Sequence, residues 1–267
     1  MKPNRSQITG LSYRFRSAIV RPPGQSVVSG LRAVNRGEPD HATYLAEHAH
    51  YCHALAEAGV EVQTLPALEA FPDSVFVEDT ALCLPQGIVI LRPGAPSRRG
   101  EADAMAEDCK VLDLPVLRLG GAGTIDGGDI LVTDREILIG ASERSNREGF
   151  DQLSAIVSKW GYEIRMVRTP ERVLHFKSDC SVLGPETILA TYRLSTEACF
   201  GDYDVLEVPR GEEPAANSIR VNDTVLVPAG YPATAAMIEA AGFNVRTVPA
   251  TQAALLDGGL SCQSLRY

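Results

Sequence analysis

The feature that most constrains the fold is a unit that recurs along the chain. Each copy has two short apolar strands joined by a tight turn, then a helix, then a third strand. The copies start at Asp79, Asp129, Cys180, Asn217 and Cys262, with spacings of 50, 51, 37 and 45 residues. Repetition at such a period is typical of repeat architectures. The third copy is short, so its helix should be weak.

The last copy begins at Cys262, and only five residues follow it. Residues 17–20, 40–59 and 60–65 supply the strand, helix and strand that this copy lacks. We therefore expect an α/β fold, a five-bladed pseudo-symmetric α/β propeller of ββαβ units closed by the two termini. Residues 1–267 would then form one domain. An ordinary α/β sheet with hairpins is the alternative.

Further helices are expected over 99–112, 146–160 and 233–241. Capping residues support the helix boundaries: Asp40 precedes the first helix, and Gly59 and Gly242 follow two of them.

The charge of the chain limits its partners. With 25 Lys and Arg against 34 Asp and Glu, the net charge is −9, which argues against nucleic acid or an anionic membrane and suits a small cationic ligand. No apolar run approaches the ~20 residues of a membrane span, and residues 1–10 are polar and offer no export signal. We expect a cytoplasmic protein whose six cysteines, none in a CxxC motif, are free thiols.

In a closed ring of units the unit starts would converge on one pocket. Polar residues also lie just before these starts, namely Asp73, Glu78, Asp126 and His175. Burying carboxylates is costly unless something pairs with them, and a cationic ligand is one such partner.

Three of these residues could perform nucleophilic chemistry. Cys262 follows a flexible Gly pair, and a thiol nucleophile needs a base nearby, for which His175 is available. Either carboxylate of Thr124-Ile-Asp126-Gly-Gly-Asp129 could orient that histidine. A buried thiol, a structural histidine and a tight Asp turn are the alternatives.

Asp73, Glu78 and Asp79 concentrate carboxylates that suit a planar guanidinium, although a metal ion or a solvated acidic loop would also explain them. Arg98 and Arg144 occupy equivalent places in adjacent units, where they could hold one carboxylate or lie on surface loops.

His48, His50 and His53 surround Cys52 but do not share one face of a helix. We therefore expect no metal site in this helix.

Taken together, the sequence resembles the dimethylarginine dimethylaminohydrolases (dimethylargininases) of the guanidine-modifying enzyme, or amidinotransferase, superfamily. The resemblance spans roughly residues 14–265. The matching stretches are Phe76-Val-Glu-Asp79, Arg92-Pro-Gly-Ala-Pro-Ser-Arg-Arg99, Thr124-Ile-Asp-Gly-Gly-Asp129, His175-Phe-Lys-Ser178 and the Cys262 tail. The family's fold is the five-unit α/β propeller.

The resemblance implies hydrolysis of Nω-methylated arginine (asymmetric dimethylarginine or monomethylarginine) to citrulline and an alkylamine through a covalent Cys-thiouronium intermediate. Cys262 would be the nucleophile, His175 the acid and base, and Asp126 the carboxylate that orients it. Asp126 is a Glu in some relatives, which keeps the role.

The implied contacts to substrate are as follows. Asp79, with Glu78 near it, would bind the guanidinium, and Asp73 with the backbone at Leu31 would bind the α-amino group. Arg98 and Arg144 would bind the α-carboxylate, and the backbone carbonyl of Leu256 would lie near the substrate. Residues 30–37 match the family's mobile lid. No metal or cofactor is implied, and a homodimer is one assembly open to the chain.

Two other functions compete with this one. A sister activity on the same groups, arginine deiminase-like or amidinotransferase-like, would keep the Cys–His chemistry. A binding module without catalysis is the other, because the same five-fold fold occurs in a ribosome-associated translation factor. The joint presence of Cys262, His175, Asp126 and Asp79 argues against the binding module. A thiol protease lacks any local signature around Cys262.

Overall fold

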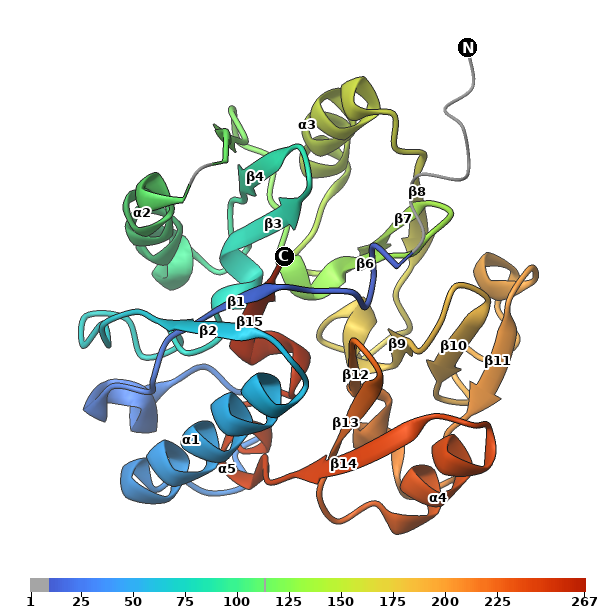
Figure 1. Cartoon of the computed structure of the whole chain (residues 1–267). Helices are drawn as coiled ribbons and strands as arrows, with labels where there is room; N and C mark the ends of the chain where they lie inside the picture. Colours follow the sequence, from blue (N-terminus) through green and yellow to red (C-terminus); the bar gives the residue numbers. More distant parts are fainter. Residues whose placement is uncertain (1–9, 113) are drawn as a thin grey trace.

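Three-stranded sheets of one construction recur throughout the protein. A computed structural model describes residues 10–112 and 114–267, and their strands form five such sheets (Figure 1). In each sheet the middle strand pairs antiparallel with one neighbour and parallel with the other. Residues 1–9, on which the expectation of no export signal rests, lie outside the described residues.

The strands follow the predicted units closely. In spatial order the sheets are β15 (Ser264–Arg266), β1 (Ser17–Val20) and β2 (Glu61–Thr64); β3 (Ala81–Leu84), β4 (Gly87–Ile90) and β5 (Val116–Arg118); β6 (Ile130–Val132), β7 (Ile137–Ala141) and β8 (Ile164–Arg168); β9 (Cys180–Val182), β10 (Thr187–Ala190) and β11 (Asp204–Glu207); β12 (Ile219–Val221), β13 (Thr224–Pro228) and β14 (Asn244–Val248).

A parallel pair of strands requires a crossover connection, and in four units a helix provides it. These helices are α1 (His41–Glu57), α2 (Arg99–Asp108), α3 (Arg147–Val157) and α4 (Pro232–Ala240). The third unit has only a short 3-10 turn, Ala198–Phe200, in that place, so the expected weak helix is confirmed. A one-turn helix, α5 (Thr251–Ala254), follows β14.

The predicted caps are present at both ends of the first helix. The Asp40 carboxylate accepts from the Thr43 amide at 2.8 Å, which satisfies one of the free N–H groups of α1. Gly59 and Gly242 follow α1 and α4 with φ of +88° and +91°, a conformation that favours glycine.

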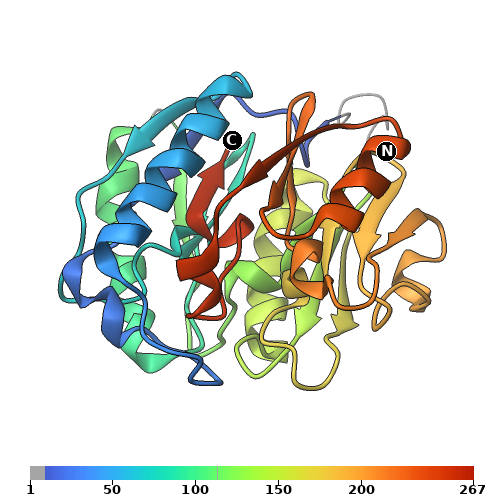
Figure 2. The same ribbon diagram turned by 90° about the horizontal axis from the view of Figure 1, so that it is seen from below.

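The two ends of the chain complete one unit, as predicted. N-terminal β1 pairs antiparallel with C-terminal β15, with Ala18 opposite Arg266 and Val20 opposite Ser264. Figure 1 shows the C-terminal segment, in red, at the centre of the view, and Figure 2 shows it between the blue N-terminal helix and the orange segments.

The middle strand of every sheet is apolar because both of its faces are buried. Alternate side chains of a strand point to opposite faces, so Val89 of β4 packs against the β6–β8 sheet while Ile88 and Ile90 pack toward β1 and β15. The same alternation occurs in β1, β7, β10 and β13. Five apolar clusters result, each shared by two neighbouring sheets.

A 3-10 turn precedes the first strand of each unit. These turns are η3 (Val77–Thr80), η6 (Gly127–Asp129), η8 (Phe176–Ser178), η10 (Glu213–Ala216) and η11 (Ser261–Gln263). Turn η3 contacts η6 and η11, and η8 contacts η6 and η10. The predicted convergence of the unit starts is therefore confirmed for these turns. Within the described ranges, none of the helices has the length and apolar character needed to cross a bilayer.

Candidate active site

The converging turns border a cavity of about 270 Å³. Nine of the ten residues singled out from the sequence line it: Leu31, Asp73, Asp79, Arg98, Asp126, Arg144, His175, Leu256 and Cys262. Arg32, Ala33, Phe76, Glu143, Leu174, Asp257 and Gly258 complete the lining. Side chains more than 180 residues apart in the chain thus border one cavity.

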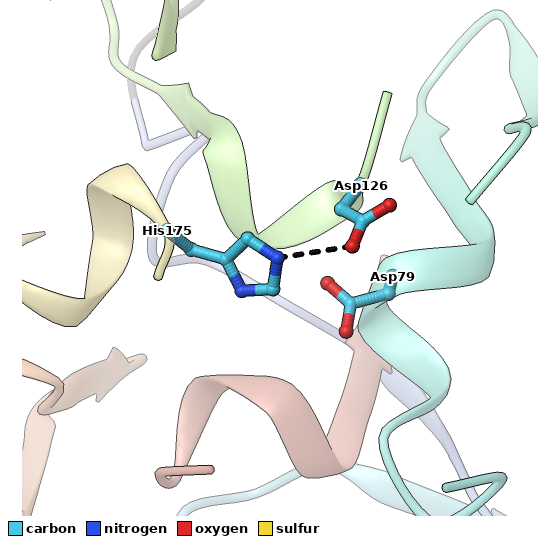
Figure 3. A group of neighbouring side chains, drawn as sticks. All are labelled: Asp79, Asp126 and His175. Carbon is cyan, nitrogen blue, oxygen red and sulfur yellow. Dashed lines mark hydrogen bonds and ion pairs between the residues drawn. The ribbon is translucent and has the colours of Figure 1, made fainter. Parts of the chain in front are cut away.

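His175 and Asp126 form a buried pair at the base of the cavity. His175 Nε2 lies 3.0 Å from Asp126 Oδ2, and the Asp79 carboxylate lies beside them (Figure 3). Burial alone would lower the pKa of His175, but the negative charge of Asp79, the hydrogen bond to Asp126 and the charge of Asp129 outweigh it and raise the pKa to about 9. The imidazole is therefore a proton donor at neutral pH.

Gly128 creates the space for this imidazole. A Cβ at this position would stand 2.5 Å from His175 Nδ1 and 3.0 Å from Asp79 Oδ1. The Gly128 amide also donates to Asp79 Oδ1 at 2.8 Å. The second glycine of the Asp126-Gly-Gly-Asp129 motif thus allows the close approach of His175 and Asp79.

Asp129 connects the loops that carry the other groups. Its Oδ2 accepts from the hydroxyls of Ser142 and Ser145, each at 2.6 Å, and its Oδ1 accepts from the Phe176 amide at 2.9 Å. Both hydroxyls in turn accept from backbone amides, that of Ser142 from Arg144 and that of Ser145 from Asp126. Of the two carboxylates in the motif, Asp126 bonds the histidine and Asp129 supports the backbone on either side of the cavity.

Cys262 is 7% exposed and lies in turn η11. Burial, together with the negative charges of Glu78 and Asp79, raises the pKa of its thiol to about 12. The thiol is therefore protonated at neutral pH, and a cation in the cavity would favour the thiolate.

Gly258 and Gly259 lie close to side chains from other segments. A Cβ at Gly258 would stand 2.3 Å from the Phe76 ring, and one at Gly259 would stand 2.4 Å from Asn217 Oδ1. Asn217 also accepts from the Ser261 amide at 2.9 Å, which holds the backbone that carries Cys262.

Arg98 is buried and already paired. Its Nη1 donates to Asp79 Oδ2 at 2.5 Å, and its Nη2 donates to Glu101 Oε2 at 2.8 Å. Burial favours the neutral form of Asp79, yet the positive charges of His175 and Arg98 lower its pKa to about 2. Arg144 lines the same cavity and is half-buried.

Glu78 is the one predicted residue that does not line this cavity. Its Oε1 pairs with Lys177 Nζ at 2.6 Å and with Arg266 Nη2 at 3.0 Å, and it borders a separate cavity of about 120 Å³. Adjacent residues of a 3-10 turn point in different directions, so Asp79 and Glu78 face different spaces. Glu78 still acts on Cys262 through its charge.

The segment predicted as a lid is bonded across the mouth of the cavity. The Leu31 amide donates to Asp73 Oδ1 at 2.9 Å, and the Ala33 amide donates to Asp257 Oδ2 at 2.5 Å. Burial raises the pKa of Asp73, against the lowering effect of Arg98.

A metal ion has one candidate place among the described residues. Ligand atoms of Asp79, Asp126 and His175 lie within 4.8 Å of one another. A cation there would have to displace the proton of His175 and compete with the guanidinium of Arg98, so the donor set favours proton transfer over metal binding.

The histidines of α1 do not gather around a common point. His48 is buried with its Nδ1 3.6 Å from the thiol of Cys52, whereas His50 and His53 are exposed. The three histidines therefore do not share one face of the helix.

Sequence reasoning did not identify several residues that shape the site. Glu101, Ser142, Ser145 and Asn217 bond the functional groups or their backbone. Asn217 was noted as a unit start, and Glu101 stands three positions after Arg98 at the beginning of a helix, a spacing that allows a side-chain pair. No sequence pattern indicated that Ser142 and Ser145 belong to the site.

The fold and the site define a guanidine-modifying type of enzyme, and comparison with known proteins narrows the class. A sequence model of the family described as "N,N dimethylarginine dimethylhydrolase, eukaryotic" matches residues 35–192, more than half of the chain. The N(G),N(G)-dimethylarginine dimethylaminohydrolase of Pseudomonas aeruginosa is 40% identical, over 95% of this chain and 100% of that protein. The chain belongs to the dimethylarginine dimethylaminohydrolase family.

Other relatives agree. The enzyme of the same name from Streptomyces coelicolor is 32% identical over 94% of this chain and 96% of that protein. The P. aeruginosa enzyme with a cysteine-to-serine mutation, complexed with citrulline, superposes with a TM-score of 0.92 at 39% identity, covering 96% of this chain and 100% of that one.

A more distant structure is similar in fold alone. The N-terminal domain of ArgZ, an arginine dihydrolase from cyanobacteria, gives a TM-score of 0.82 at 20% identity, covering 95% of this chain and 97% of that one.

Proposed function

We propose that this protein hydrolyses Nω-methylated arginine, meaning asymmetric dimethylarginine or monomethylarginine, to citrulline and dimethylamine or methylamine. One observation carries the proposal. A single cavity is lined by a thiol, a His–Asp pair and a further carboxylate, in a chain 40% identical to a dimethylarginine dimethylaminohydrolase over that enzyme's whole length.

Binding would use the charges of the cavity. Asp79 would accept from the guanidinium, Asp73 and the backbone at Leu31 would hold the α-amino group, and Arg144 with the free N–H of Arg98 would hold the α-carboxylate. The carbonyl of Leu256 would lie beside the substrate. Glu78, from behind Cys262, would add negative charge that favours the same cation.

The first chemical step would be attack by Cys262 on the guanidinium carbon. The bound cation offsets the carboxylates that keep the thiol protonated, so binding itself promotes thiolate formation, with the thiol proton released to solvent water. His175 would then give its proton to the departing amine, breaking the carbon–nitrogen bond and leaving a thiouronium on Cys262.

Hydrolysis of the thiouronium would complete the cycle. His175, now neutral and oriented by Asp126, would take a proton from water as the water oxygen attacks the same carbon. The carbon–sulfur bond then breaks, and citrulline and the Cys262 thiol are released. No metal or cofactor takes part in these steps.

The test is a citrulline assay with asymmetric dimethylarginine, monomethylarginine and arginine, each without added metal, and with Cys262→Ser as the control. Citrulline from the methylated substrates supports the proposal. Citrulline from arginine alone would replace it with a deiminase-like activity, and transfer of the amidine to an added amine would replace it with an amidinotransferase-like one. No product from any of the three would overturn it.

We also propose that the five units form one domain, a pseudo-symmetric α/β propeller closed by the two termini. Two observations support this closed arrangement. Each sheet shares an apolar cluster with two neighbouring sheets, and β1 pairs with β15. A homodimer and a cytoplasmic location stay predictions from the sequence, and light scattering on the purified protein tests the first of these.

A further inference from the structure

Arg98 bridges two buried carboxylates with opposite edges of its guanidinium. Its Nε donates to Glu101 Oε1 and Oε2 at 3.2 and 3.1 Å, and its Nη2 donates to Glu101 Oε2 at 2.8 Å and to the Phe76 carbonyl at 3.0 Å. Its Nη1 donates to Asp79. Arg98 and Glu101 are 5% and 3% exposed.

In this arrangement Arg98 and the guanidinium of a bound substrate would compete for Asp79. Asp79 is the carboxylate that the proposed function assigns to the substrate guanidinium, and Arg98 presents a guanidinium of the protein's own to the same carboxylate. At these exposures water screens the charges little, so an unbalanced Arg98 would hold Asp79 strongly. Glu101 balances that charge from the other edge. The first turn of α2, where Glu101 lies, favours a carboxylate.

We propose that Glu101 is a positioning residue that determines how strongly Arg98 holds Asp79. By pairing with the Nε–Nη2 edge in a bidentate manner, Glu101 offsets the charge of Arg98 and leaves Asp79 free to accept a cationic guanidinium. The inference rests on the proposed function. It makes Glu101 a determinant of selectivity for cationic over neutral side chains in the cavity.

The proposal predicts that loss of the Glu101 charge affects the binding of two ligands differently. Asymmetric dimethylarginine and citrulline share the α-amino and α-carboxylate groups, but only the first carries a cation to Asp79. Loss of the Glu101 charge should therefore weaken dimethylarginine specifically. A general disturbance of the site would weaken both ligands.

The experiment is titration calorimetry with both ligands on the Cys262→Ser protein, which prevents turnover. The measurements are made near pH 8, because burial raises the pKa of Glu101 to about 7. Adding Glu101→Gln should raise the Kd of dimethylarginine about tenfold or more and that of citrulline less than about threefold. Glu101→Asp, which keeps the charge, should restore most of the preference.

The matched control is Glu107→Gln on the same helix, since Glu107 is exposed and, among the described residues, pairs with Lys110 alone. It should change neither Kd. A folded Glu101→Gln protein with an unchanged ratio of the two Kd values would overturn the proposal while leaving the function intact. A parent protein that binds neither ligand would overturn both.

Circular dichroism and thermal unfolding report whether Glu101→Gln folds. If it does not, the double variant Arg98→Met, Glu101→Met tests the same reasoning, since an apolar pair of similar volume often replaces a buried ion pair without loss of stability. Without Arg98 the protein's own guanidinium no longer competes for Asp79, so both ligands weaken but dimethylarginine keeps at least its parental preference. A lower preference would contradict the proposal.

Discussion

Adding one methyl group at Gly128 should disable the site without removing any functional group. The Cβ of Gly128→Ala would stand 2.5 Å from His175 Nδ1, whereas ordinary contact begins near 3.4 Å, so the imidazole must move by about 0.9 Å. Gly128 has no positive φ, so the alanine backbone itself is unstrained. The movement breaks the 3.0 Å hydrogen bond between His175 and Asp126.

The expected magnitude follows from that displacement. A misplacement of about 1 Å in a catalytic group can cost ~10²-fold in rate, and overpacking a buried site costs about 1–3 kcal/mol of stability. Citrulline formation under saturating substrate measures kcat, and thermal unfolding measures the loss of stability.

Gly120→Ala is the matched control, because a Cβ there meets no atom within 4 Å. It should leave both quantities unchanged. If folded Gly128→Ala protein kept its kcat within about twofold of the parent, the imidazole position inferred here would be wrong.

Three further predictions concern groups of the same site. Cys262→Ser should abolish citrulline formation while leaving the circular dichroism spectrum and unfolding midpoint nearly unchanged, and residual turnover near the parental rate would exclude the thiol as nucleophile. The pKa of His175 is raised from 6.5 to about 9 in the folded protein, so its contribution to stability is complete below pH 6.5 and is lost as pH rises toward 9. Urea unfolding measured across this pH range should show the decline in stability. The His175→Asn variant cannot titrate at this position and should not show that decline. Asp129→Asn leaves Ser142 and Ser145 without a charged acceptor, so it should cost about 2–4 kcal/mol in urea unfolding and also lower kcat; a variant as stable as the parent would show that the two serines find other partners.

The architecture could be predicted from the sequence because its strands and turns depend on residues that are close together in the chain. Short apolar runs predicted the strands, and Gly, Asn, Asp and Pro predicted the turns between them. The middle strands are predominantly apolar because they lie between two clusters, and a short apolar run marks such a strand in any one unit. The recurrence of the unit then identified β1 and β15 as parts of one sheet, which the register of Ala18 and Arg266 confirms.

The candidate site was readable in part. Residues of reactive type stand at or just before the unit starts, and nine of the ten named from the sequence line one cavity. Glu78 is the one of the ten that does not line this cavity, since its carboxylate points to Lys177 and Arg266 in the neighbouring cavity. Nothing in the order Glu78-Asp79 tells which of two adjacent carboxylates faces which space.

The sequence by itself therefore determined the units, their boundaries, and the residues that could carry out the chemistry. Only the tertiary structure decided which side chains pair: Asp126 with His175, Arg98 with both Asp79 and Glu101, and Asp129 with two serines. The reason is that the two kinds of feature depend on residues at different separations along the chain. Strand and turn patterns depend on neighbours a few residues apart, whereas charge pairs and pKa values depend on distances of about 3 Å between side chains from different units, set by how the whole chain packs.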